Sequence, residues 1–199
     1  FFIPSVDARV KAVLATAAPI SFPASTSLLT FMPATISDSK CSCAFRAKNS
    51  FSKGNILSFN GEIGYGEAYG NKPYPITKNY FVGGIGSVRG YAPGSLGPQY
   101  YNTTTGAWLP TGGQSKIVTN VEYTFPVPGS GVDKTLRLFG FVDGGNTFQA
   151  INLNLRYSYG VGLSWISPLG PLKFSYGIPI NTQANDNIQR LQFQVGTAF

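Results

Sequence analysis

Hydrophobic and polar residues alternate along much of the second half of the chain. In residues 155–166 the odd positions carry large apolar or aromatic side chains, and the even positions are mostly Gly, Ser and other small or polar residues. A period of two residues is typical of a β-strand with two unlike faces. The pattern recurs in five further stretches, which are residues 56–66, 116–125, 136–143, 172–179 and 191–199. The sequence therefore predicts six strands after residue 50.

Residues 1–50 lack this clear alternation. They are rich in Ala, Ser, Thr and Pro, and four prolines interrupt any regular element. We expect the segment to be irregular, or a distorted strand region, and separate from residues 51–199. A short signal sequence with a basic start at Arg9 and Lys11 is the alternative. Because the single Met lies at position 32, we expect the chain to be a piece of a longer protein.

The residue types on the polar faces of the predicted strands help to distinguish two all-β architectures. Alternation alone fits both a soluble sandwich and a transmembrane barrel. In residues 155–166 and 172–179 the polar face is largely Gly and Ser, which suits a confined lumen better than a water-facing surface. The strands are about ten residues long, as transmembrane strands are, and no stretch reaches the roughly 18 apolar residues of a spanning helix. The pattern favours the strands of a transmembrane antiparallel β-barrel, with the sandwich as the alternative.

Composition narrows the possible functions. Only 12% of the residues are charged, about half the usual share, and 15 Lys and Arg against 8 Asp and Glu give a net charge of +7. The chain has no His, which removes the commonest general base and metal ligand. Cys41 and Cys43 fit neither a zinc pattern nor a disulfide framework. We therefore expect no enzymatic activity, no cofactor, no metal site and no nucleic-acid partner.

A connection of nearly fifty residues, 67–115, separates the first predicted strand from the second. Loops of this length are usually functional or disordered. Its centre, residues 80–91, repeats Gly among apolar residues, and Arg89 is the only cation there. The glycine run 83–86 is superficially similar to a phosphate-binding loop, but no Lys followed by Ser or Thr comes after it. The loop therefore predicts a packed functional element built around Arg89.

Four motifs in order resemble those of the BamA-type outer-membrane assembly factors. Residues 84–91 are similar to the Val-Arg-Gly-Phe/Tyr loop signature of that family. The other three are the Asp-bearing strand at residues 141–146, the Trp-Ile-Ser-Pro-Leu-Gly-Pro-Leu hairpin at residues 165–172, and the aromatic-ended terminal strand at residues 191–199. Four ordered motifs make chance agreement improbable. The resemblance covers roughly residues 51–199.

The resemblance implies a fold, a location and a function. The family barrel has sixteen strands, so this chain is expected to hold the last six, with up to two irregular strands before them. The expected location is the bacterial outer membrane, with the lipid bilayer, unfolded outer-membrane protein substrates and accessory assembly lipoproteins as partners. The expected function is non-enzymatic insertion of β-barrel proteins. Two alternatives remain: a two-partner secretion transporter, and a barrel lipase, against which the absence of His argues.

The resemblance also implies a site at the tip of the long loop. We call its four residues the loop-lock motif: Val88, Arg89, Gly90 and Tyr91. Arg89 is expected to fold into the lumen and pair with Glu122 and above all Asp143. Strand parity places Glu122 on the polar face and Asp143 on a mixed face, and a guanidinium has enough donors to bridge two carboxylates. The alternative is that Arg89 only caps a turn in water.

The terminal strand carries the second predicted site. The resemblance implies that Phe193, Val195 and Phe199 form an assembly signal, which the insertion machinery reads. An amphipathic strand that ends in an aromatic residue is also what any outer-membrane barrel presents. These three residues therefore support the class of protein more than its function.

Overall fold

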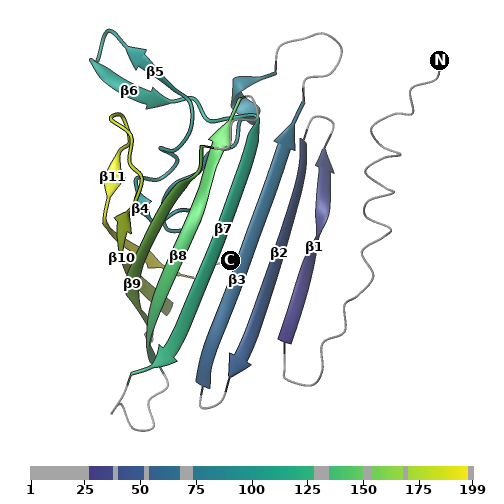
Figure 1. Ribbon diagram of the computed structural model, residues 1–199, viewed down its shortest axis with the longest axis vertical. Coiled ribbons are helices and arrows are strands. Elements are labelled where there is room, and N and C mark those ends of the chain that lie inside the picture. Colours follow the sequence, from purple (N-terminus) through teal and green to yellow (C-terminus); the bar gives the residue numbers. More distant parts are fainter. Residues whose placement is uncertain are drawn as a thin grey trace, which may run out of the picture.

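The chain is built mainly of β-strands (Figure 1). The computed structural model describes residues 27–37, 40–51, 54–67, 74–127, 135–149, 154–167 and 170–196. The long strands are β1 (Ser27–Ser37), β2 (Lys40–Phe51), β3 (Asn55–Gly66), β7 (Ser115–Pro126), β8 (Leu136–Phe148), β9 (Arg156–Ser167) and β10 (Gly170–Pro179). The short elements are η2 (Ile76–Lys78), β4 (Gly90–Tyr91), β5 (Gln99–Asn102), β6 (Ala107–Pro110), β11 (Ile188–Gln189) and β12 (Leu191–Val195). Among the described residues no helix is long and apolar enough to cross a membrane.

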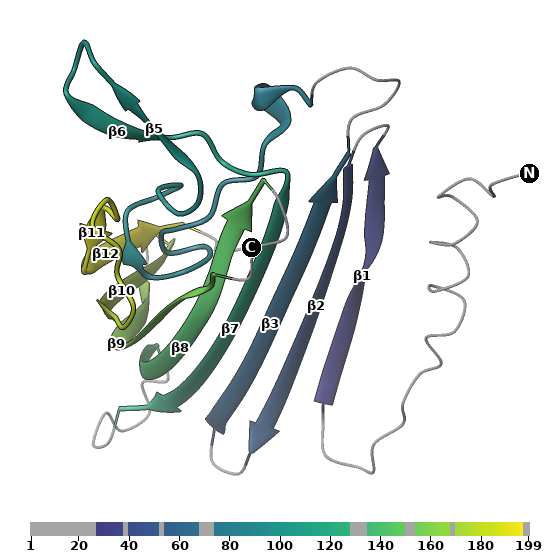
Figure 2. The same cartoon turned by 45° about the horizontal axis from the view of Figure 1, so that its top comes forward.

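The described strands form one eight-stranded antiparallel sheet in the order β1-β2-β3-β7-β8-β9-β10-β12. Apart from the short strands β4–β6 and β11, which pair outside it, this order follows the chain. The sheet curves strongly, with β1 at one edge and β12 at the other (Figures 1 and 2). A curved meander of long neighbouring strands is the arrangement of an up-and-down barrel wall.

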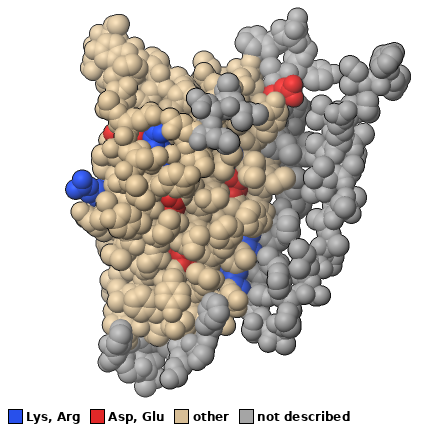
Figure 3. All heavy atoms as spheres, in the orientation of Figure 1, with Lys and Arg blue, Asp and Glu red and all other residues tan. Residues whose placement is uncertain are grey.

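The register of the strands gives the sheet two unlike faces, as the alternation predicts. Val121, Val142 and Tyr159 lie opposite one another on adjacent strands, so that apolar side chains continue from strand to strand. On β9 the side chain of Val161 is 65% exposed, whereas Ser158 is fully buried on the other face. Charged side chains are few on the face of the molecule seen in Figure 3. An exposed apolar band with little charge is suited to lipid.

Two glycines on the inner face of β9 make room for aromatic rings from β8. Gly160 lies opposite Phe141 and Gly162 lies opposite Phe139. A Cβ at Gly162 would lie 2.2 Å from the Phe139 ring, and one at Gly160 would lie 2.7 Å from the Phe141 ring. The rings therefore lie over the glycine backbone. The inner face of the sheet therefore leaves room for the long loop at this point.

The hydrophobic core cluster of the described residues lies between the long loop and the wall, inside the curve of the sheet. It consists of Val82, Val88, Tyr91 and Leu96 from the loop and Val118 from β7. Complete burial of such a side chain contributes about 1.5–3 kcal/mol. Most of this apolar burial belongs to the loop and fixes it against the sheet.

Residues 27–50, for which we expected an irregular segment or a distorted strand region, form strands in the structure. These residues form β1 and most of β2, and β2 pairs with β3 without interruption from Lys40 to Phe51. The alternation is weak there because small residues such as Ala47 share the outward face with the aromatic Phe45. In β1 the register shifts between Met32 and Thr35, around Pro33, which cannot donate a ladder hydrogen bond. Strand pairing thus continues across the expected boundary at residue 50; residues 1–26 lie outside the described residues.

Candidate functional site

The long connection between β3 and β7 folds back against the inner side of the curved sheet (Figure 2). Isolated bridges join Tyr80 to Gly113 near its base and Val82 to Leu96 nearer its tip. A turn at the tip is closed by the backbone N–H of Ser87, which donates to the carbonyl oxygen of Gly84 at 3.0 Å. The turn brings the loop-lock motif against β7, β8 and β10.

Arg89 binds Asp143 through both side-chain and backbone donors. Its Nε lies 2.7 Å from Oδ2 of Asp143 and its Nη2 lies 2.8 Å from Oδ1, a two-pronged contact. Its backbone N–H donates to Oδ2 at 3.1 Å. Arg89 is 4% exposed and Asp143 is fully buried. A carboxylate on β8 thus holds the loop tip in both position and orientation.

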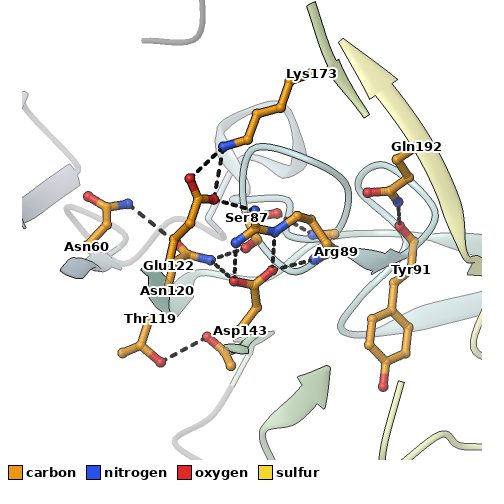
Figure 4. A network of polar contacts seen from close by, with 12 residues as sticks. Asn60, Ser87, Arg89, Tyr91, Thr119, Asn120, Glu122, Asp143, Lys173 and Gln192 are labelled. Atoms are coloured by element: carbon orange, nitrogen blue, oxygen red, sulfur yellow. Dashed lines mark hydrogen bonds and ion pairs between the residues drawn. The ribbon is translucent and has the colours of Figure 1, made fainter. Parts of the chain in front are cut away.

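Glu122 on β7 accepts a hydrogen bond from the third nitrogen of the Arg89 guanidinium. Nη1 of Arg89 lies 2.7 Å from Oε2 of Glu122, and Nζ of Lys173 on β10 lies 3.0 and 2.9 Å from the two oxygens of Glu122. The Glu122 side chain is 19% exposed, so water has more access to it than to Asp143. Figure 4 shows two cations and two carboxylates alternating in one network. The network therefore joins the loop to three strands.

Asn120 connects the turn of the loop to the carboxylate of Asp143. Its Nδ2 donates to Oδ1 of Asp143 at 2.9 Å and also to the carbonyl oxygen of Ser87. Its Oδ1 accepts from Nδ2 of Asn60 on β3 at 3.4 Å. With these contacts Asp143 accepts four described hydrogen bonds, which is what a fully buried carboxylate requires.

The guanidinium of Arg89 also lies over an aromatic ring. Its Cζ is 3.6 Å from the centroid of Phe141 and 5.7 Å from that of Phe139. Nζ of Lys173 lies 4.4 Å from the Phe139 centroid. A desolvated cation over a ring gains up to about 2 kcal/mol. The rings beneath the cations thus add attraction from the face that the carboxylates leave open.

Gly90 packs against the backbone of Gly177 on β10, at a position where a side chain on residue 177 would not fit. Gly90 has a φ of 91°, a conformation that favours glycine. A Cβ at Gly177 would lie 2.7 Å from the nitrogen of Gly90. The absence of side chains at both positions therefore lets the motif lie directly on the wall.

The far side of the motif is covered by the end of the chain. Tyr91 is fully buried, and its carbonyl oxygen accepts a 2.7 Å hydrogen bond from Nε2 of Gln192 on β12. β11 pairs with β4, placing Ile188 opposite Tyr91 and Gln189 opposite Gly90. The motif thus lies between the barrel wall and the segment that leads into the last strand.

Arg89 remains charged in this buried place. Burial by itself disfavours the guanidinium charge and would lower the pKa of Arg89. The hydrogen bonds and negative charges of Asp143 and Glu122 outweigh that effect and raise the pKa above its ordinary value. The guanidinium of Arg89 therefore stays protonated at physiological pH.

A hollow of about 250 Å³ lies beside the cluster. It is lined by Arg46 and Lys48 of β2 as well as by Arg89, Glu122 and Lys173. Among the described residues no group of three or more His, Cys, Asp or Glu side chains is placed to hold a metal ion. The chemistry that the site offers is the binding of one loop to several strands.

The structure brings together the residues that were expected to form the loop site. Val88 lies in the core, Arg89 contacts both expected carboxylates, and Gly90 packs on the wall. Arg89 does not cap a turn in water. The three residues of the expected assembly signal are not gathered into this site. Phe193 and Val195 are exposed on the outer face of β12, at 69% and 62%, and Phe199 lies outside the described residues.

Sequence reasoning assigned no role to four residues that complete the site. They are Asn120, Phe141, Lys173 and Gln192. Strand parity already put all four on the inner face, so parity was the signal that could have found them. Parity does not say which inward residues meet, because that depends on the register of three strands.

The chain belongs to the Omp85 superfamily. Residues 34–199, most of the chain, match the Omp85 superfamily domain. This membership confirms the predicted fold class, the strands of an outer-membrane β-barrel, and agrees with the predicted outer-membrane location.

Individual relatives agree with this membership. The chain is 38% identical over 177 residues to the outer membrane protein assembly factor BamA of Neisseria meningitidis, covering 74% of this chain and 22% of that protein. It is 28% identical over 163 residues to BamA of Nitratidesulfovibrio vulgaris, covering 78% and 20%. It is 30% identical over 148 residues to the sorting and assembly machinery component 50 homolog B of Xenopus laevis, covering 65% and 30%. The chain thus spans about a fifth of its bacterial relatives.

The fold has a similar counterpart among solved structures. The crystal structure of BamA from Haemophilus ducreyi lacking POTRA domains 1–3 superposes with a TM-score of 0.69 at 26% sequence identity. The match covers 89% of this chain and 39% of that chain. The eight-stranded sheet therefore corresponds to part of a larger protein of the same fold.

Proposed function

We propose that the chain is the C-terminal part of a barrel that assembles and inserts other β-barrel proteins into the bacterial outer membrane. The observation that carries the proposal is Arg89 bound to Asp143 and Glu122 inside the sheet, in a chain 38% identical to an assembly factor. The activity is non-enzymatic: it depends on strand pairing and on the shape of the barrel.

The proposed role of the loop-lock motif is to keep the wall rigid around the working edge of the barrel. Arg89 joins β7 and β8, and Lys173 extends the network to β10. Exposed ion pairs contribute only about 0–1 kcal/mol, but Asp143 is fully buried. Loss of its partner costs about 3–5 kcal/mol. The loop is therefore expected to stay docked while an incoming strand adds to the free edge of β12.

The proposed working edge is β12. An edge strand presents unpaired N–H and C=O groups, to which an incoming strand can add. Unfolded outer-membrane proteins are the proposed substrates, the lipid bilayer surrounds the exposed apolar band, and accessory lipoproteins are further proposed partners. Phe193, Val195 and Phe199 remain the proposed assembly signal. The two-partner secretion transporter is not favoured, because the named relatives are assembly components.

The proposal is tested with the full-length protein in liposomes, to which an unfolded outer-membrane protein is added. We expect insertion, measured by protease protection, to be faster than in empty liposomes, and Arg89→Ala to slow it. The matched control is Arg137→Ala, which removes an arginine near the start of β8 that does not line the hollow beside the cluster. No acceleration by the wild-type protein would contradict the assembly function. Equal rates for the wild type and Arg89→Ala would contradict the role of the motif.

A further inference from the structure

The segment between β10 and β12, residues 180–190, lies against the loop-lock motif on the side away from β8. The backbone N–H of Ala92 donates to the carbonyl oxygen of Asn187 at 2.8 Å, and that of Gly177 donates to the carbonyl oxygen of Arg190 at 2.8 Å. The second of these carbonyls immediately precedes β12. The same few residues thus contact the loop tip and begin the last strand.

A second buried ion pair holds this segment in place. Nε of Arg156, at the start of β9, lies 2.7 Å from Oδ2 of Asp186, and the side chains are only 6% and 5% exposed. Nη2 of Arg156 lies 3.4 Å from Oδ1, and the backbone N–H of Gln183 donates to Oδ2 at 2.7 Å. The pair thus fixes both the position of the segment and its local turn.

The start of the segment is fixed to the same strand. Oδ1 of Asn181 accepts from the backbone N–H of Tyr157 at 2.8 Å, and Nδ2 of Asn181 donates to the carbonyl oxygen of Leu155 at 2.6 Å. Asn181 and Asp186 therefore attach two points of the segment to β9. Between the second point and β12 lies β11, whose partner is β4 of the motif.

The ion pair is close enough to the motif to affect it electrically. Burial, followed by the negative charge of Asp186, raises the pKa of Tyr91 to about 12, against a smaller opposing effect of Arg156. The Tyr91 hydroxyl donates to the carbonyl oxygen of Tyr157 at 3.4 Å. Tyr91 therefore packs against the strand that carries Arg156.

We infer that the Arg156–Asp186 pair is a second latch, which couples the docked state of the loop-lock motif to the pairing of β12 with β10. Arg156 and Asp186 act as positioning residues: they hold β11 where it can pair with β4, and β11 in turn fixes where β12 begins. Release of either the motif or the segment weakens the attachment of the other, because the two share the β4–β11 pair. This rests on the proposed function only in making β12 the working edge.

Hydrogen–deuterium exchange of the full-length protein in a lipid membrane, without substrate, tests the latch. Asp186→Asn is expected to speed exchange at least tenfold in peptides that contain Ala92 and Gly177, and to leave β7 and β8 unchanged. The matched control, Glu62→Gln, removes an ion pair with Lys116 elsewhere in the wall and is expected to leave both peptides slow. Unchanged exchange in the Asp186→Asn protein, or equal acceleration in every strand, would overturn the inference.

A double variant distinguishes coupling from local loosening. Arg89→Ala alone is expected to speed exchange around Ala92 and, through β11, in β12. Adding Asp186→Asn to it should give less than the product of the two single effects, because the shared contacts are already lost. Effects that simply multiply would refute the coupling.

A milder substitution tests the latch if the Asp186→Asn protein fails to insert into the membrane. Arg156→Lys keeps the charge but loses the two-nitrogen contact, and is expected to speed the same two peptides by a smaller factor; no change would count against the latch. Exchange is read from the inserted barrel alone. The exchange result is therefore independent of the insertion assay for the proposed function.

Discussion

Two parts of the connection between β3 and β7 have opposite environments despite similar composition. In the tip, residues 82–96, the side chains of Val82, Val88 and Leu96 are at most 1% exposed. In the hairpin formed by β5 and β6, which projects from the sheet in Figure 2, Tyr100, Tyr101 and Trp108 are about half exposed. Neither part contains an acidic residue, and both are rich in apolar groups.

The difference shows that hydrophobicity alone does not decide which part of the loop docks. The hairpin has its own ring contact, Tyr101 with Trp108 at 5.4 Å between centroids, but no charged residue between Gln99 and Pro110. In the tip, Arg89 pairs with carboxylates of the wall, and Gly90 packs against wall backbone that carries no side chain. Specific polar pairing and close approach therefore direct the docking, and apolar burial strengthens it.

Removal of the cation should have the largest effect on the tip. Arg89→Ala leaves Asp143 buried without its main partner, and we expect the docked tip to lose about 3–5 kcal/mol. The amide of residue 89, which donates to Asp143, should then exchange much faster, as hydrogen exchange measures. Arg89→Lys is the control. It keeps the charge but loses the two-nitrogen contact, and its exchange rate should fall between those of the wild type and Arg89→Ala. Slow exchange in Arg89→Ala would show that apolar packing suffices.

A side chain at the contact between the two glycines should have the next largest effect. Gly177→Ala places a Cβ 2.7 Å from the nitrogen of Gly90, and overpacking of this kind costs about 1–3 kcal/mol. Gly140→Ala is the matched control, because the nearest atom to its Cβ is 3.9 Å away. Equal urea midpoints for the two variants would contradict a role for close approach.

Loss of the outer cation should have a small effect. Lys173→Met leaves Glu122 with Arg89, and the Lys173 and Glu122 side chains are 26% and 19% exposed. Because both side chains are only partly exposed, we expect a loss of about 1 kcal/mol in urea unfolding, the upper end for a surface pair. A loss as large as that of Arg89→Ala would mean that the four charges act as one unit.

Changes in the hairpin should not reach the tip. Trp108→Ala removes the ring contact with Tyr101, which contributes about 0.5–1.5 kcal/mol locally. We expect exchange at Arg89 to stay at the wild-type rate, while exchange in β5 and β6 rises. Faster exchange at Arg89 would show that the two parts of the loop are not independent.

The sequence was enough to predict the strands after residue 50 and their two faces, because alternation in residues 155–166 is strong. The pairing of Arg89 with Asp143 was expected through the resemblance and through the lack of any other cation near the tip. The contact of Gly90 with Gly177 could not be foreseen in detail, since it depends on how a loop and a distant strand meet. Residues 40–50 were expected to be at most an irregular strand, because small residues such as Ala47 share the outward face of β2 with Phe45 and the alternation is weak.

The hydrogen bond from Gln192 to Tyr91 spans 101 residues of sequence. Arg89 likewise precedes Glu122 and Asp143 by 33 and 54 residues. Contacts this distant in sequence close large loops and tend to form late in folding. During synthesis the motif appears before every strand that binds it. Docking of the tip is thus completed only when β12, which carries Gln192, has joined the sheet.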